Sequence, residues 1–227
     1  MMADEYRQTL LLTLSLAGLT TSFLLVVGIP LAYWLVYGRF RFKPVVEAIV
    51  SLPLVLPPTV TGFYLLIAFS DNSQLGHWLI HTLGLHLNFT FTGILVGSLF
   101  YSLPFMVHPI QAGFQNLPAS LREASFTLGK SEFTTAWRVL LPNIKPALLS
   151  GIVLAFAHTI GEFGLVLMIG GNIPGKTRVA SIAIYDAVES FDYGRANAYA
   201  LVLLGVSFSI LLTLFVVNKQ LRTRSVL

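Results

Sequence analysis

The chain contains no cysteine among its 227 residues, which excludes disulfide bonds, thiolate nucleophiles and thiolate metal sites. Charge is scarce as well, because Asp, Glu, Lys and Arg supply only 11% of the residues, against roughly 25% in soluble domains. No G-x-x-x-x-G-K-[ST] phosphate loop, nucleophile elbow or completed metal-ligand cluster occurs, so we expect no ATPase or other enzymatic activity, catalytic residue, metal or cofactor in this chain. Hydrophobic residues make up 55% of the chain and the mean hydropathy is +0.77, which indicates an integral membrane protein.

Long apolar segments take the place of charge. A hydrocarbon core ~30 Å thick requires about 20 apolar residues per helix, and the segment 8–38, for example, contains no charged residue. We predict an all-α integral membrane protein with one transmembrane domain over 1–227. Its five spans are predicted near 10–37, 47–69, 89–113, 146–169 and 197–217. The first span is too long for a cleaved signal peptide, and Asp4 and Glu5 precede it.

Basic residues are distributed unevenly between the connections of these spans. The positive-inside rule places the more basic side in the cytoplasm, with the N-terminus outside and the C-terminus inside. The pI near 9.5 follows from this asymmetry, so we expect lipid and not nucleic acid as the partner of the basic residues. Ten of the fourteen Lys and Arg residues lie on the cytoplasmic side: Arg39, Arg41, Lys43, Arg122, Lys130, Arg138, Lys145, Lys219, Arg222 and Arg224.

The cytoplasmic loop 115–145 carries a charged segment, Glu123–Pro142, between two apolar spans. Gly129 is predicted to end a first short helix, and Ser131 is predicted to cap a second one. Two short helices that meet at a glycine would form a protrusion with Phe126 and Leu128 exposed. Taken alone, this pattern also fits an ordinary connecting loop that lies on the lipid surface.

The spacing of this loop resembles the E-A-A-x3-G-x9-I-x-L-P coupling loop of ABC importer permeases, which fits a cleft on the ATP-binding subunit. Two positions depart from that pattern, since Ser125 replaces the second alanine and Val139 replaces isoleucine. The resemblance implies a type I ABC importer permease fold with a cytoplasmic coupling helix. It also implies contacts to the ATP-binding subunit from Glu123, Ala124, Ser125, Gly129, Val139, Leu141 and Pro142.

Three further segments narrow the resemblance. The sequences L-P-L-V-L-P-P-T-V-T-G at 52–62, G-E-F-G at 161–164 and N-I-P-G-K-T at 172–177 are similar to segments of molybdate permeases. The resemblance thus runs from about residue 45 onward and favours molybdate or tungstate, with the related sulfate permeases as the alternative. It implies a homodimer in a bacterial or archaeal cytoplasmic membrane. Two ATP-binding subunits would carry ATP and Mg, and an extracytoplasmic binding protein would deliver the oxyanion.

The proline-rich segment 52–62 also has a direct physical interpretation. Prolines remove backbone donors, and the freed carbonyls must face protein or a water-filled cavity instead of lipid. Transporters place their pathways at such broken helices. We therefore predict pathway or gate residues at Pro57, Pro58, Thr59 and Thr61, with a simple packing kink as the alternative.

Glu162 is an acidic residue inside a predicted span, and such a charge costs about 2.5–3.5 kcal/mol on insertion scales. His158 lies one turn earlier on the same face. The pair fits either a proton relay of a secondary transporter or, as we prefer, a structural pair that fixes a bend between Gly161 and Gly164. In both cases these residues are assigned to the pathway or gate.

The external segments contain the remaining candidates. A loop facing the binding protein is predicted at Asn172, Pro174, Gly175, Lys176 and Arg178, with the two basic residues suited to guiding an anion. His77 and His81 have a spacing that can hold zinc, but only Asp71 lies near in sequence, so an exposed turn is expected. We interpret His108 as a satisfied polar residue of the third span, and Gly93 and Gly97 as a site of close helix packing.

Overall fold

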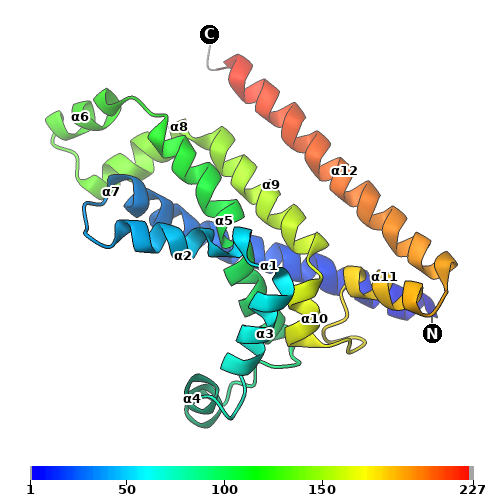
Figure 1. Ribbon diagram of the computed structural model, residues 1–227. Helices are drawn as coiled ribbons and strands as arrows, with labels where there is room; N and C mark the ends of the chain where they lie inside the picture. Colours follow the sequence, from blue (N-terminus) through cyan, green and yellow to red (C-terminus); the bar gives the residue numbers. More distant parts are fainter. Residues whose placement is uncertain (1, 225–227) are drawn as a thin grey trace.

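A computed structural model describes residues 2–224, and over this range it is helical and contains no strand. Figure 1 shows long helices running roughly together, with the short helices α6–α8 at one end. The elements are α1 (Met2–Tyr37), α2 (Lys43–Val55), α3 (Pro58–Ala68), α4 (Gln74–Leu83), α5 (Phe91–Gln115), α6 (Ala119–Thr127), α7 (Glu132–Thr135), the π-helical turn η1 (Ala136–Leu140), α8 (Leu141–Asn143), α9 (Lys145–Gly161), α10 (Gly164–Gly170), α11 (Ala180–Glu189) and α12 (Tyr193–Arg224).

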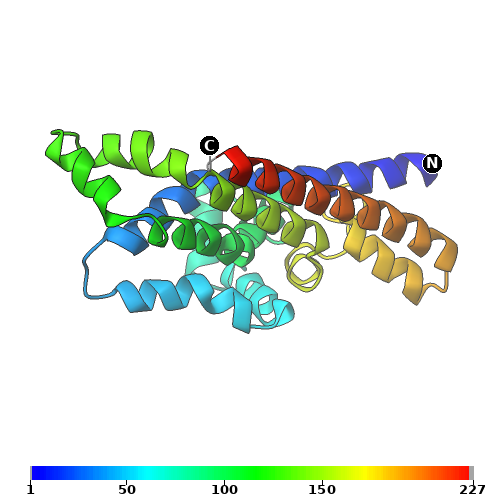
Figure 2. The same cartoon turned by 90° about the horizontal axis from the view of Figure 1, so that it is seen from above.

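Helices α1, α5 and α9 form the centre of the fold, and each contacts the other two. One apolar cluster joins them toward the α6–α8 end, and it includes the fully buried Leu35, Ile110 and Leu140. A second cluster around Leu165 and Ile169 joins α10 to α3 and α5. Helix α12 lies at the edge against α9 and α11, and Figure 2 shows it beside α9 along the length of the molecule.

Three helices, Asp4–Tyr37, Phe91–Gln115 and Tyr193–Asn218, are long and apolar enough to cross a membrane. Two bent helix pairs raise the number to as many as five. The predicted span 47–69 corresponds to α2 and α3, which are bent by 115° at Leu56 and Pro57. The predicted span 146–169 is likewise divided into α9 and α10. The arrangement of five spans stays a prediction.

The predicted close helix packing is found at Gly97, whereas Gly93 packs against the turn before its own helix. A Cβ atom on Gly97 would lie 2.6 Å from Ile169 Cδ1 and 2.8 Å from Leu165 Cδ2, so Gly97 lets α10 approach α5. A Cβ on Gly93 would lie 1.8 Å from the carbonyl oxygen of Leu87, in the turn that enters α5. Gly97 therefore lets α5 pack closely against α10, and Gly93 lets the turn before α5 pack closely against the start of that helix.

Candidate functional site

Helices α6 and α7, the turn η1 and helix α8 (residues 119–143) form a projection at one end of the molecule. It begins with two short helices that meet at a glycine. Helix α6 ends before Gly129, whose φ of +70° is the left-handed conformation that glycine tolerates. Lys130 N–H donates to the Ser125 carbonyl at 3.1 Å, and the Ser131 hydroxyl caps α7 by accepting from Thr134 N–H at 3.3 Å. Leu128 is 75% exposed beside this turn, so an apolar side chain projects where α6 ends.

Polar contacts fasten the projection to α1. Glu132 accepts hydrogen bonds from Tyr33 at 3.1 Å and from Arg122 at 3.2 Å. The Arg122 guanidinium also lies over the rings of Tyr37 and Phe126, 4.9 Å from each centroid. The projection is thus tied to the end of a long helix by contacts from both α6 and α7.

The predicted coupling residues divide into an exposed and an inward set. Glu123, Ala124, Gly129 and Pro142 are exposed and available to a partner. Ser125 is buried, and its hydroxyl lies 2.8 Å from that of Thr135, which joins α6 to α7. The remaining two, Val139 and Leu141, are half-buried against the core cluster of α1, α5 and α9. The inward residues shape the projection and do not form its outer surface.

Pro142 explains the irregular helix that leads out of the projection. Proline has no N–H to bond within a helix, and the chain widens into the π-helical turn η1 just before it, with Leu141 N–H donating to the Ala136 carbonyl. Helices α8 and α9 then meet at Ile144, at a bend of 78° measured between the segments Glu132–Asn143 and Lys145–Gly161. The projection therefore leaves the direction of α9 sharply.

The two helix breaks lie against each other. Gly164, which begins α10, approaches the first turn of α3 so closely that a Cβ would lie 3.1 Å from both Pro58 Cβ and Thr59 Cγ2. One turn further, a Cβ on Gly62 would lie 2.8 Å from Met168 Cβ. The sequence predicted both breaks, and the structure brings them together into one contact.

The other residues predicted at these breaks have different surroundings. Pro57 is exposed at the bend between α2 and α3, whereas Thr61 is buried, and its hydroxyl has no hydrogen-bond partner among the described residues. Gly161 ends α9, and a Cβ there would have no atom of another residue within 4 Å. The packing between the breaks is therefore carried by Gly164, Gly62 and their neighbours.

Glu162 lies in the break between α9 and α10 and its side chain is only 3% exposed. One carboxylate oxygen accepts from Leu165 N–H at 3.3 Å, which caps the first turn of α10. The other lies 3.8 Å from Nε2 of His158, and the imidazole Nδ1 lies 3.0 Å from the Ser102 hydroxyl. These contacts link α5, α9 and α10 at the bend, and the role of the pair stays a prediction.

The loop between α10 and α11 is held by an ion-pair network. Arg178 is 13% exposed and donates to Glu5 at 2.8 Å, with Asp186 at 3.8 Å. It also donates to Asn172, whose amide donates to Asp186 at 2.9 Å. Arg178 therefore holds the loop to α1 and α11, and its charge is already balanced by these acids. Lys176, Pro174 and Gly175 form the exposed turn of the loop.

One group of polar residues, on α2 and α5, was not predicted as a site from the sequence. Together with Ala112, these residues line a cavity of about 500 Å³ between α2 and α5, here called the polar groove: Glu47, Ser51, His108, Gln111 and Gln115. The sequence signal was the heptad spacing of His108 and Gln115 on α5, combined with Glu47 and Ser51 one turn apart on α2. His108 lies 3.2 Å from the Ser51 hydroxyl and is satisfied as expected, but it belongs to this larger set.

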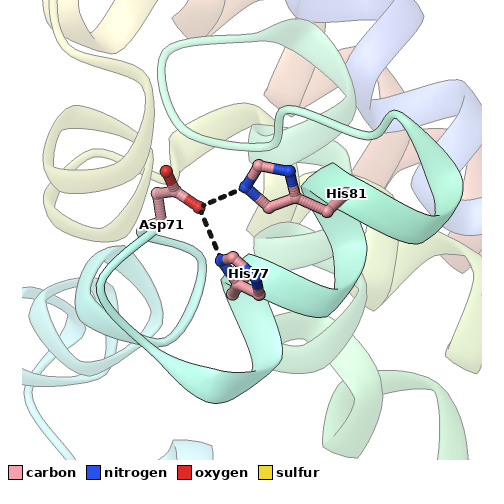
Figure 3. Close-up of side chains that lie close together, drawn as sticks. All are labelled: Asp71, His77 and His81. Carbon is pink, nitrogen blue, oxygen red and sulfur yellow. Dashed lines mark hydrogen bonds and ion pairs between the residues drawn. The ribbon is translucent and has the colours of Figure 1, made fainter.

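A second polar cluster lies before and within α4, far from the projection. Figure 3 shows Asp71 pointing at two imidazoles, with Oδ1 at 3.3 Å from His77 Nδ1 and 3.1 Å from His81 Nε2. All three side chains are exposed, as the sequence led us to expect for a surface turn. Their ligand atoms nevertheless lie within 4.8 Å of one another, a proximity that chain spacing alone did not reveal.

A helical membrane domain with two adjoining helix breaks and a projection held to α1 has the architecture of a transport permease. A family model described as "Binding-protein-dependent transport system inner membrane component" matches residues 24–224, and the chain belongs to this family. It is 47% identical over 205 residues to the molybdenum transport system permease protein ModB of Azotobacter vinelandii, covering 90% of each chain. It is 38% identical over 193 residues to the sulfate transport system permease protein CysT of Escherichia coli (strain K12), covering 85% of this chain and 68% of that one.

Solved structures agree on the fold. The inward-facing MetNI methionine ABC transporter matches with a TM-score of 0.75 at 16% identity, covering 96% of this chain and 97% of that chain. A bacterial ABC transporter that imports alginate matches with a TM-score of 0.79 at 18% identity, covering 96% and 80%. The chain therefore has the type I ABC importer permease fold and is a multi-pass permease subunit of an ABC importer. This assignment gives no support to a proton-coupled secondary transporter.

Proposed function

We propose that the chain forms the translocation pathway of an ATP-driven importer for molybdate or tungstate. The observation that carries the proposal is the 47% identity to ModB over 90% of both chains, against 36–39% to the sulfate permeases. Sulfate is the second candidate, because the sulfate relatives also match over most of this chain and sulfate has the same tetrahedral dianionic chemistry.

The proposed assembly is a homodimer with two ATP-binding subunits and an extracytoplasmic oxyanion-binding protein. Helix α12 supports a dimer or a lipid-facing position, since only 6% of its most apolar window is buried within one chain. Two copies would enclose a pathway that so few spans cannot enclose alone. The family's dependence on a binding protein supports an external donor of the oxyanion.

The proposed coupling runs from the exposed turn of the projection to the helix breaks. The ATPase would press on the surface around Glu123, Ala124 and Gly129, and the contacts of Glu132 and Arg122 would carry the movement into α1. The contact of α3 with α10 at Gly164 is the candidate gate, because it joins two helices that start at breaks. Selectivity would reside mainly in the binding protein, and the permease would bind the oxyanion weakly.

Uptake into proteoliposomes tests the substrate. The assembled transporter is reconstituted with ATP inside and binding protein outside, and labelled molybdate uptake is measured against excess tungstate or sulfate. We expect tungstate to compete at stoichiometric concentrations and sulfate only at large excess. Equal competition by sulfate would overturn the molybdate assignment and leave the ABC permease assignment intact.

A pair of arginine substitutions tests the coupling surface. Ala124→Arg places a bulky charge on the exposed face of α6, whereas Thr82→Arg places it on the exposed end of α4, far from α6 in Figure 1. We expect Ala124→Arg to abolish both co-purification of the ATPase and uptake, and Thr82→Arg to leave co-purification unchanged. Normal ATPase binding by a folded Ala124→Arg variant would contradict the coupling assignment.

A further inference from the structure

The polar groove between α2 and α5 contains more hydrogen-bonding groups than packing requires. Gln111 donates to Glu47 at 3.3 Å, and Ser51 lies 3.2 Å from Nε2 of His108. Gln115 is exposed one heptad after His108, on the same face of α5. A cavity of about 500 Å³ remains beside these side chains, which is large enough for a hydrated oxyanion.

The position of the groove argues against contact with hydrocarbon. Ser51 and His108 lie within predicted spans, and Glu47 and Gln111 lie near the ends of the same spans, where contact of a carboxylate with hydrocarbon is still unfavourable. Polar faces within spans therefore turn toward protein or a water-filled cavity. Because α2 begins and α5 ends at this level, next to the projection, the groove opens on the side predicted to be cytoplasmic.

Beyond the groove, a hydrogen bond joins α2 and α5 near the helix break. The Tyr101 hydroxyl, one heptad before His108 on α5, donates to the Leu56 carbonyl at 3.2 Å. Leu56 immediately precedes Pro57, where α2 turns into α3. The same two helices thus carry a polar cavity toward the cytoplasmic side and a hydrogen-bonded contact at the break.

We propose that the polar groove is the cytoplasmic half of the oxyanion path, a transit site where Gln111, Gln115 and His108 donate hydrogen bonds to the passing dianion. The inference rests on the proposed function. Glu47 keeps the affinity of the site for the oxyanion low, because its carboxylate repels a dianion and also accepts the hydrogen bond of the Gln111 amide. A site whose hydrogen-bond donors include no bound cation and no arginine suits an oxyanion that must be released quickly.

Thiol labelling tests the groove directly, because the chain has no native cysteine. Ser51→Cys is introduced in the assembled transporter in membranes and treated with an anionic, water-soluble methanethiosulfonate. Leu204→Cys on α12 is the matched control, since Leu204 is 68% exposed on an apolar helix face. We expect Ser51→Cys to react at least ten times faster than the control, and millimolar molybdate to slow its reaction severalfold.

The outcomes separate the groove from the substrate assignment. If Ser51→Cys reacts no faster than Leu204→Cys, the proposal for the groove is wrong, even if molybdate uptake is intact. Fast labelling that sulfate slows and molybdate does not supports the groove and overturns the molybdate assignment. Fast labelling that neither oxyanion slows shows hydration without transit and overturns the binding role. If Ser51→Cys fails to assemble, Gln115→Cys at the exposed end gives the same comparison.

The cluster of Asp71, His77 and His81 carries a second, independent inference. The two histidines lie one turn apart on α4 with ring centroids 4.1 Å apart, a spacing that can present two nitrogens to one ion. Between Asp71 and the histidines, the Ser73 hydroxyl caps α4 by accepting from Gly76 N–H at 2.8 Å. Three ligand atoms within 4.8 Å leave the fourth tetrahedral position to water.

The geometry points to an exposed Zn²⁺ site at this triad, on the side predicted to be extracytoplasmic. Asp71 Oδ1 already lies 3.1–3.3 Å from the two imidazole nitrogens, close to the separation of two ligands that are each about 2.0–2.1 Å from one tetrahedral ion, so binding requires only rotamer adjustment of exposed side chains. Such a site would pin the turn at Asp71 to α4. Its affinity is expected to be modest, because water competes at all three ligands.

Metal titration of the full chain, with any polyhistidine tag removed, tests this site. Zn²⁺ binding is followed by calorimetry, and Co²⁺ substitution is followed by the absorption bands of a tetrahedral ion. We expect His81→Gln to weaken Zn²⁺ binding at least tenfold and His86→Gln, a nearby control outside the triad, to leave it unchanged. Equal binding by the wild type and the His77→Gln/His81→Gln double variant would overturn the site.

Discussion

Replacement of Gly129 gives the sharpest test of how the projection is built. Its φ is +70°, and a Cβ built there would have no atom within 4 Å apart from those of its two chain neighbours. The cost of a side chain is therefore conformational and not steric. For an L-residue the left-handed conformation costs roughly 1–2 kcal/mol, and asparagine tolerates it better than alanine. The expected order of stability at this turn is glycine, then asparagine, then alanine, with valine worst.

A local cost of about 1–2 kcal/mol corresponds to a factor of about 5–30 in the population of the closed turn. Amide hydrogen exchange over residues 128–131 should accelerate by this factor in Gly129→Ala and by less in Gly129→Asn. Gly18→Ala is the control, since Gly18 lies within α1 with nothing within 4 Å of its Cβ position, and alanine favours the helix. ATP-dependent uptake should fall in the same order as exchange rises.

Two results would refute this reasoning. Unchanged exchange in Gly129→Ala would show that the turn does not require the left-handed conformation. Faster exchange combined with normal uptake would show that the geometry of this turn is not needed for coupling, and the assignment of the projection as the ATPase contact would fail. The asparagine variant distinguishes both from a general loss of folding, because it keeps the backbone conformation accessible.

Three further predictions follow from the packing. Gly93→Ala should prevent stable folding in a thermal unfolding assay, since its Cβ meets the Leu87 backbone, whereas Gly97→Ala meets only flexible side-chain ends and should cost less. Ser125→Ala removes the hydrogen bond to Thr135, whose hydroxyl still donates to the Ser131 carbonyl at 2.9 Å, and should destabilise by about 0.5–1.5 kcal/mol, with the double variant less than additive. Glu162→Gln keeps an oxygen for the Leu165 amide and should retain uptake, while loss of uptake with normal stability would revive the proton relay.

The local features of the fold followed from the sequence because their causes are local. Proline removes a donor, so the bend after Val55 was predictable from Pro57 and Pro58. Glycine stops a helix and serine caps one, so the turn of the projection at Gly129 and Ser131 was predictable as well. Charge distribution likewise determined the predicted orientation, because membrane insertion responds to the number of basic residues in each loop.

Only the tertiary structure decided which surfaces these elements present. Ser125 belongs to the coupling motif, yet it is buried because Thr135 accommodates its hydroxyl. The sequence suggested that Arg178 could guide an anion, but in the structure Glu5, which is distant in sequence, lies 2.8 Å from its guanidinium. The polar groove depends on the register of α2 against α5, which no single-helix pattern contains. The sequence by itself determined an all-helical permease with broken helices and a two-helix projection, because these depend on local residue chemistry, and long-range packing decided which of their residues are buried and which are exposed.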